Sequence, residues 1–267
     1  MKWSGAVVAV TGASRGIGAE VARQAAARGA RVGLLARNAD ELAALAAELP
    51  TESLVVPVDV TKPKDLVAAL RQVRDELGPI DVLVNNAGIG AYGPFVEGGA
   101  DQLAQLWPIN VAAVANAMAE VLPDMQTRGS GVIVNMTSIA GRIGAPGEAA
   151  YCASKFAVIG LSETIRAEVA DSGVKICLIN PGPVATAFGE ARGHPYDRSF
   201  PKPVSATHVA KRTIRSIERG TPEIYIPRWL RPSLIVKNLA PPLFDRGVRP
   251  EARRMLKKWK ETHQEPR

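Results

Sequence analysis

The stretch TGASRGIG (residues 11–18) follows a short apolar run and precedes an alanine-rich segment. A glycine-rich turn that leaves a strand and enters a helix brings backbone N–H groups and the positive end of the helix dipole against a phosphate. Gly12 would allow the tight turn, Gly16 the approach of a pyrophosphate, and Gly18 close packing of helix on strand. The spacing departs from the commoner G-x-G-x-x-G, so a turn without a ligand stays open as the alternative. The residues expected to bind a dinucleotide are Gly12, Ser14, Arg15, Gly16, Ile17 and Gly18.

The rest of the chain alternates short apolar runs with longer segments of helical spacing. Strands are expected over residues 6–10, 31–35, 54–58, 82–85, 131–136, 174–179 and 223–226. Helices are expected over residues 16–28, 39–49, 63–77, 101–125, 151–172 and 205–218. Most strand runs are apolar nearly throughout, as in parallel sheets that helices cover on both faces. The pattern predicts an α/β fold with a doubly wound, seven-stranded parallel Rossmann-like sheet and helices on both faces.

The 267 residues could form one large domain or two small ones, and nothing in the composition marks a division, so one domain is favoured. We expect a domain over residues 1–227, including a Gly- and Pro-rich substrate loop at about 182–203, and a basic extension over 228–267 packed on or beside it. Apolar residues make up 46% and charged residues 22%, values ordinary for a globular protein with a substantial core. The first apolar run is too short for a secretory signal, so a cytoplasmic location is expected.

Two sequence features exclude other classes of site. Cys152 and Cys177 have no paired spacing, so neither a disulfide framework nor a metal site is expected. The net charge of +7 lies entirely in residues 228–267, and the preceding residues sum to zero. Because the sheet domain is neutral and the basic segment matches no known recognition module, no nucleic-acid partner is expected.

The basic extension contains an amphipathic pattern. Its apolar positions are Ala252, Met255, Leu256 and Trp259, with Lys and Arg largely around them. Packing on the chain's own core or across a subunit boundary is favoured, because amphipathic helices usually face protein. The alternative is contact with an anionic membrane surface beside the apolar segment 234–244.

The residues at the end of the second expected strand indicate whether a dinucleotide carries a 2′-hydroxyl or a 2′-phosphate on its adenosine ribose. In GLLARN (residues 33–38) the position where an acid would bind a ribose 2′-hydroxyl is Ala36, and Arg37 follows it. Arg37 and Arg15 could instead hold a 2′-phosphate, which predicts NADP(H) as the cofactor. The alternative is that Arg37 is a solvated residue at a helix start.

The stretch YCASK (residues 151–155) places a phenol and an ammonium on one helical face. A nearby cation favours phenolate and lowers the pKa of Tyr151, so Tyr151 could exchange a proton with an alcohol or a forming alkoxide. Ser138 follows a strand run at the edge where ligands bind, and its hydroxyl could hold a carbonyl oxygen. NNAG (residues 85–88) ends another run at the same edge. A Tyr–Lys pair or a strand-end serine alone is common by chance.

Together, TGASRGIG, NNAG, Asn110, Ser138, YCASK and PGPVAT (residues 181–186) resemble the motifs of the short-chain dehydrogenase/reductase family, in its order, from about residue 5 to residue 227. The resemblance implies that Tyr151 is the catalytic acid/base and that Lys155 lowers its pKa and holds the nicotinamide ribose. It implies that Ser138 orients the carbonyl and that Asn110 keeps a water in a proton relay. The further cofactor contacts that it implies are Asp59, Val60, Asn86, Ala87, Gly88, Pro181, Gly182, Val184 and Thr186.

The function that follows is hydride transfer between NADP(H) and a carbonyl or secondary alcohol. Apolar residues in 188–200 and 226–244 favour a lipophilic ketone, although core packing explains them equally well. A sensor that binds the cofactor without turnover is the alternative function. The resemblance also implies a homodimer or homotetramer. His194 and His208 fit no family motif and are interpreted as surface or loop residues.

One departure concerns Pro108, two residues before Asn110 in the helix expected over 101–125. Proline removes a backbone donor and can kink a helix. It could therefore fix a bend that positions Asn110, or displace Asn110 from the site.

Overall fold

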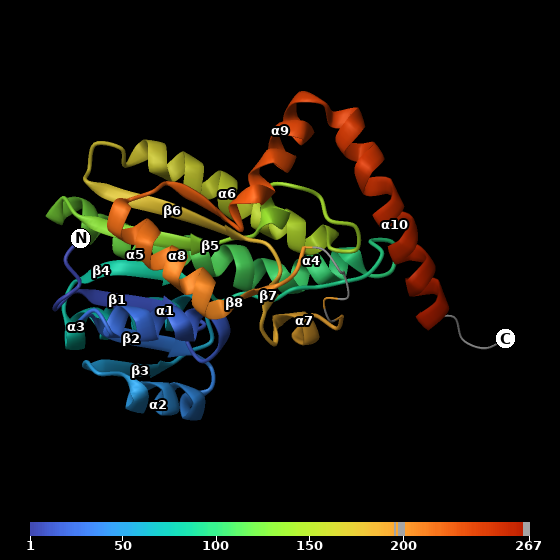
Figure 1. The fold of residues 1–267 in the computed structure, drawn as a ribbon. Coiled ribbons are helices and arrows are strands. Elements are labelled where there is room, and N and C mark those ends of the chain that lie inside the picture. The colour runs from blue at the N-terminus through green and yellow to red at the C-terminus, as the bar shows by residue number, and fades with distance from the viewer. Residues whose placement is uncertain (195, 197–200, 264–267) are drawn as a thin grey trace.

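The computed structural model describes residues 1–194, 196 and 201–263, and its core is one seven-stranded parallel sheet (Figure 1). The strand order is β3-β2-β1-β4-β5-β6-β9. The strands are β1 (Val7–Thr11), β2 (Arg31–Ala36), β3 (Ser53–Pro57), β4 (Ile80–Asn85), β5 (Gly131–Met136), β6 (Val174–Pro181) and β9 (Glu223–Ile226). The order reverses between β1 and β4, which is where ligands bind in such sheets. The predicted fold class is confirmed.

Helices cover both faces of this sheet, as its apolar strands require (Figure 1). One apolar layer joins the sheet to α1 (Gly16–Ala26), α2 (Ala39–Glu48) and α8 (Ala206–Arg219). The opposite layer joins it to α3 (Pro63–Leu77), α5 (Ala113–Arg128) and α6 (Ala149–Glu168). The glycine turn, the strand ends and the start of α6 are therefore held between two packed layers.

The segment expected to be helical over 101–125 is helical, but it is not one regular α-helix. The chain forms α4 (Gly99–Trp107), a π-helical turn over Pro108–Ala112, and then α5. Pro108 begins the wide turn because it has no N–H to continue the α-helical pattern. Asn110 lies within the turn and is fully buried, so the proline accompanies a bend without expelling the asparagine.

The segment expected to be a loop over 182–203 is partly folded. β7 (Val184–Ala185) pairs with β8 (Val204–Ser205), and the short helix α7 (Phe188–Ala191) lies between them. Residues 195 and 197–200 of this predicted loop lie outside the described residues. Within the described part of this segment, the Phe188 ring lies 5.7 Å from the ring of Tyr151, which belongs to the first turn of α6.

After β9 the chain forms an arm that projects from the body (Figure 1). A 3₁₀ turn over Arg228–Leu230 leads into α9 (Arg231–Leu239), which rises away from the sheet, and α10 (Pro241–His263) returns towards α4. Met255 is buried on the inner side of α10, and the Trp259 indole donates to the Glu97 carboxylate. None of the helices in the described residues is long and apolar enough to span a membrane.

Candidate active site

The glycine turn has the conformation that its sequence requires. Gly12 and Gly16 have φ values of +64° and +59°, which other residues rarely adopt. A Cβ on Gly18 would lie 2.3 Å from the Gly12 carbonyl oxygen and 2.5 Å from Nδ2 of Asn86. Gly18 therefore serves close packing between the start of α1 and the end of β1.

The start of α1 is suited to an anion. Arg15 occupies the N-cap position in an extended conformation, and no side chain among the described residues caps the helix there. The first-turn N–H groups therefore keep donors for a ligand, and the helix dipole favours negative charge. Thr186 faces the turn, because a Cβ on Gly16 would lie 3.5 Å from its Cγ2. The residues present fit the pyrophosphate of a dinucleotide.

Asn86 joins the glycine turn to the end of β4. Its Nδ2 donates to the carbonyl oxygens of Thr11 and Gly12, both at 3.0 Å. The Thr11 hydroxyl oxygen in turn accepts the backbone N–H groups of Asn86 at 3.0 Å and Ala87 at 3.1 Å. The side chain of Asn86 thus braces the turn, and Thr11 is a supporting residue that the sequence analysis missed.

The ends of β2 and β3 form the region expected to receive the adenosine. Arg37 and Arg15 are both exposed there, and Arg15 pairs with Glu41 at 3.2 Å. Asp59 accepts the backbone N–H and the hydroxyl of Thr61, and these hydrogen bonds lower the pKa of its carboxyl. Glu41 was not expected here, because it is four positions beyond Arg37 and becomes Arg15's partner only when α2 folds back.

Asn110 is held by three hydrogen bonds. Its Oδ1 accepts the N–H of Ile89 at 2.9 Å, and its Nδ2 donates to the Ile89 carbonyl at 2.9 Å and to the Ser154 hydroxyl at 3.0 Å. The π-helical turn therefore fixes the asparagine against the loop after β4. A Cβ on Gly88 would approach Oδ1 of Asn110 to 3.2 Å and Nζ of Lys155 to 3.6 Å, so Gly88 leaves room for both.

Lys155 is a buried ammonium at the centre of the site. Its Nζ donates to the Met136 carbonyl at 3.0 Å and lies 5.7 Å from the centroid of the Tyr151 ring. Burial penalises the charged form and lowers the pKa of Lys155 to about 8. The lysine is therefore still mainly an ammonium at neutral pH and loses its charge as the pH rises through about 8.

Tyr151 lies in an apolar pocket beside Ser138. Only 9% of the residue is exposed, and its ring lies 5.7 Å from that of Phe188. The expected lowering of its pKa by Lys155 is wrong for this structure. Burial raises the pKa of Tyr151 above its ordinary value, the charge of Glu148 adds to this, and a hydrogen bond with Ser138 opposes it. Desolvation of the phenolate is the largest of these causes, because the ring is enclosed.

Ser138 follows the end of β5 and lies beside Tyr151 of α6. Its hydroxyl oxygen accepts the backbone N–H of Ala140 at 3.1 Å and donates towards the Pro181 carbonyl at 3.4 Å. The hydroxyl is therefore held at the rim, within hydrogen-bonding reach of Tyr151. The structure brings Ser138, Tyr151, Lys155 and Asn110 together at one edge of the sheet.

A second set of residues closes the space above Tyr151. Arg192 forms a 2.8 Å ion pair with Glu148, and both side chains are nearly buried. The Arg192 guanidinium lies 5.4 Å from the centroid of the Tyr92 ring, and His194 stacks on the same ring at 4.1 Å. These residues come from three loops with no shared sequence pattern, so the sequence offered no signal for the cluster.

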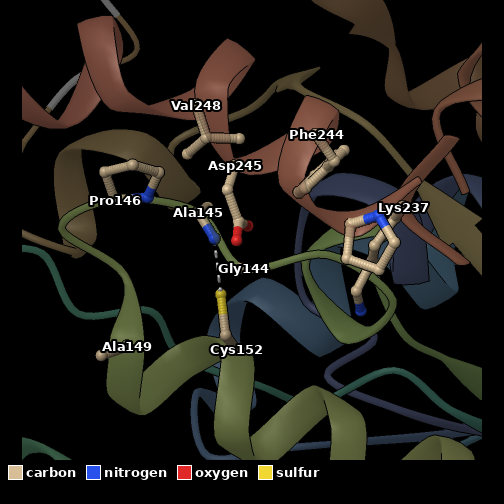
Figure 2. A pocket seen from close by; sticks show the side chains of 10 residues that line it. Gly144, Ala145, Pro146, Ala149, Cys152, Lys237, Phe244, Asp245 and Val248 are labelled. Atoms are coloured by element: carbon tan, nitrogen blue, oxygen red, sulfur yellow. Dashed lines mark hydrogen bonds between the residues drawn. The ribbon is translucent and has the colours of Figure 1, made fainter.

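A cavity of about 570 Å³ lies beside this pocket, beneath the arm (Figure 2). Phe244, Asp245 and Val248 of α10 line one side of it, and Ala145 and Cys152 line the other. The Ala145 N–H donates to Sγ of Cys152 at 3.3 Å, and both residues also pack in the apolar cluster around Tyr151. They form the wall that the cavity shares with the Tyr151 pocket. Burial raises the pKa of the Cys152 thiol to about 11, so it is not a reactive thiolate.

The geometry agrees with the known proteins that this chain resembles. The ketoacyl reductase HetN of Nostoc sp. is 32% identical over 231 residues, which cover 84% of this chain and 79% of HetN. A short-chain dehydrogenase from Sphingobium yanoikuyae in complex with NADPH has 29% identity and a TM-score of 0.78, covering 88% of this chain and 94% of that chain. A short-chain dehydrogenase/reductase from Burkholderia phymatum in complex with NAD has 26% identity and a TM-score of 0.80, covering 91% of this chain and 96% of that chain.

The family model for short chain dehydrogenases matches residues 6–197, which hold the glycine turn, the strand-end residues and the Tyr151–Lys155 pair. The match spans more than half of the sequence and agrees with the observed sheet order. The chain belongs to the short-chain dehydrogenase/reductase family of oxidoreductases.

Proposed function

We propose that the protein transfers a hydride between NADP(H) and the carbon of a lipophilic ketone or its secondary alcohol, with Tyr151 as proton donor and acceptor. The observation that carries this is the meeting of the Tyr151 phenol, the Ser138 hydroxyl and the Lys155 ammonium beside an uncapped helix start. When bound, the cofactor supplies or accepts the hydride. The residues implied by the resemblance to touch it are those of the glycine turn and the ends of β2, β3, β4 and β6.

Four side chains bind the substrate oxygen, transfer the proton and hold the cofactor. Ser138 holds the substrate oxygen, and Tyr151 gives its proton to that oxygen as negative charge develops on it. The raised pKa of Tyr151 keeps the phenol protonated at neutral pH, which favours the reductive direction. Lys155 holds the nicotinamide ribose, and Asn110 positions a water behind Lys155 for the return of the proton.

An apolar, uncharged substrate is supported by the walls of the pocket. Leu106, Ala140 and Ala145 pack around Tyr151 with Phe188 at the edge. Arg192, the cation at the mouth, is already neutralised by Glu148. Such a pocket excludes water and offers no free charge for an anionic substrate. The name of HetN, a ketoacyl reductase, supports a carbonyl substrate.

The test is a panel of ketones and aldehydes assayed with NADPH, with loss of reduced cofactor followed by absorbance. We expect turnover of apolar ketones and little turnover of carboxylated analogues of the same size. Direct NADPH binding is measured in parallel by fluorescence. Binding without turnover of any member of a broad panel would favour a cofactor sensor and overturn the proposed activity.

Arg37→Asp is expected to shift cofactor preference from NADPH towards NADH. The exposure of the Arg37 guanidinium after β2 supports a contact with a 2′-phosphate, whereas an aspartate there would repel the phosphate and accept a ribose hydroxyl. Loss of a charge-assisted contact predicts a change of roughly tenfold to a hundredfold in the ratio of the two kcat/KM values. Lys64→Asp, the same charge change on an exposed position of α3, is the control. An unaltered ratio in the Arg37 variant contradicts the NADP(H) assignment.

The reductive reaction is expected to weaken as pH rises through about 8, the pKa of Lys155. Below that pH the ammonium is present to hold the ribose, and above it the charge is lost. The phenol of Tyr151 does not cause this decrease at alkaline pH, because burial raises its pKa far above 8. The measurement is the pH profile of kcat/KM for NADPH, which reports groups of the free enzyme. A profile that stays flat into strongly alkaline solution, with circular dichroism unchanged, speaks against Lys155 as the group that binds the ribose.

A further inference from the structure

The arm formed by α9 and α10 carries exposed apolar side chains at the turn between the two helices. Ile235 is 56% exposed, Leu239 81% and Leu243 62%, and Val236 is exposed beside them. On α9, positions 235, 236 and 239 share one face. We call these four residues the apex cluster. Figure 1 shows that this turn stands away from the sheet, at the top of the view.

The two sides of α10 have different chemistry. At about 100° per residue, Phe244, Val248, Met255 and Trp259 share one side, and their contacts with the body are described above. On the opposite side, Leu243 of the apex cluster is followed by Arg246, Arg254 and Lys257, all exposed. We call these three cations the basic stripe. The packing expected for the amphipathic helix therefore occupies one face and leaves the other open.

Charge is distributed very unevenly between the arm and the body. Residues 228–267 contain 11 Lys and Arg against 4 Asp and Glu, and the preceding residues are neutral overall. Lys257 pairs with Glu261 at 3.9 Å in the described part of the arm, and both side chains are exposed. An ion pair this exposed to water is weak. Most of the positive electrostatic field of the arm therefore stays uncompensated.

We propose that the apex cluster and the basic stripe bind the surface of an anionic membrane, with the apex cluster inserted at the acyl boundary and the stripe against the headgroups. An anionic bilayer surface binds apolar side chains at its acyl boundary and cations at its headgroups. The projecting turn offers the apolar residues, and α10 continues the same face with cations. A second copy fits less well. Two arms of like charge repel each other, and a body without net charge does not attract the basic arm at long range.

The first test is flotation of the full-length protein with vesicles. The protein is mixed with phosphatidylcholine vesicles, or with vesicles that also contain phosphatidylserine, and centrifuged in a density gradient. We expect flotation only with the anionic vesicles, and release when the salt concentration is raised, because headgroup attraction is screened. The proposed catalytic activity plays no part in this measurement, so the two proposals fail separately.

Two pairs of substitutions locate the surface. Leu239→Asp/Leu243→Asp changes the apex cluster, and Arg246→Glu/Arg254→Glu changes the basic stripe. Because all four residues are exposed, we expect unchanged thermal unfolding and a fall of at least about tenfold in partitioning onto anionic vesicles.

Control variants make substitutions of the same kind elsewhere on the surface. Val96→Asp replaces an 89%-exposed aliphatic residue on the loop before α4. Lys64→Glu/Lys211→Glu makes the same change in net charge on exposed positions of α3 and α8. We expect both controls to float like the natural protein.

Three results overturn the proposal. The first is a natural protein that stays at the bottom of the gradient with anionic vesicles. The second is flotation that the arm variants do not reduce below the controls. The third is self-association, measured by sedimentation velocity without lipid, that the Leu239/Leu243 variant abolishes while vesicle binding is absent; this result assigns the surface to a second copy.

Discussion

Tyr151→Phe is expected to lower turnover of ketones by roughly a hundredfold to ten-thousandfold, the usual contribution of a positioned acid or base. The variant keeps the ring that packs against Phe188 and loses only the hydroxyl beside Ser138. The glycine turn and the start of α1 are untouched, so the dissociation constant of NADPH should barely change. Steady-state kinetics and fluorescence titration of the cofactor measure the two quantities separately.

A second buried tyrosine provides the control. Tyr225→Phe removes a hydroxyl that donates to Glu223 at 2.8 Å, in a residue about as buried as Tyr151. It should lose stability and keep turnover. If Tyr151→Phe retains turnover within the range of this control, the phenol is not the proton donor.

Lys155→Met is expected to abolish turnover and to stabilise the fold. The buried ammonium has its pKa lowered from 10.5 to about 8, so its charge opposes folding at neutral pH. A shift of this size means that the buried charge destabilises the fold by about 3 kcal/mol. The variant avoids this cost but loses about 1 kcal/mol with the hydrogen bond to the Met136 carbonyl. A net gain of about 2 kcal/mol raises Tm by roughly 4–8 °C in a chain of this size.

The stability gained by Lys155→Met is expected to shrink as pH rises. Below about 8 the lysine is protonated in both the folded and the unfolded chain, and the full cost is present. Between 8 and 10.5 the unfolded chain binds more protons, so the natural protein gains stability and approaches the variant. Thermal unfolding at neutral and alkaline pH measures the convergence. Lys64→Met, on the exposed face of α3, should show no such trend, and a lower Tm for Lys155→Met at neutral pH would refute the argument.

The sheet, and the position of the site residues at one of its edges, could be predicted because both follow from short stretches of sequence. Runs such as Val82–Val84 are apolar on both faces, which only a covered parallel sheet explains. The carboxyl ends of parallel strands meet at one edge, so Gly12, Asn86 and Ser138 had to lie there. The family motifs then supplied the roles that spacing alone left open.

Other features depend on packing that no local pattern encodes. The ion pair of Glu148 and Arg192 joins residues 44 positions apart, from segments without periodicity. The direction of the Tyr151 pKa depends on how completely Phe188 and its neighbours exclude water, and the sequence shows only the nearby cation. The arm was predicted as an amphipathic stripe, but its projecting turn follows from the angle between α9 and α10.

The π-helical turn at Pro108–Ala112 sets an angular phase between two consecutive helices. A π turn holds one residue more than an α turn, which rotates everything after it by about 100°. Leu106, before the turn, can therefore face Tyr151, while Ala117 and Val121, after it, face the sheet. In an uninterrupted helix these three side chains would lie on one face. They could then not contact both the Tyr151 pocket and the sheet. The extra residue lets one continuous stretch of chain serve both the substrate pocket and the core.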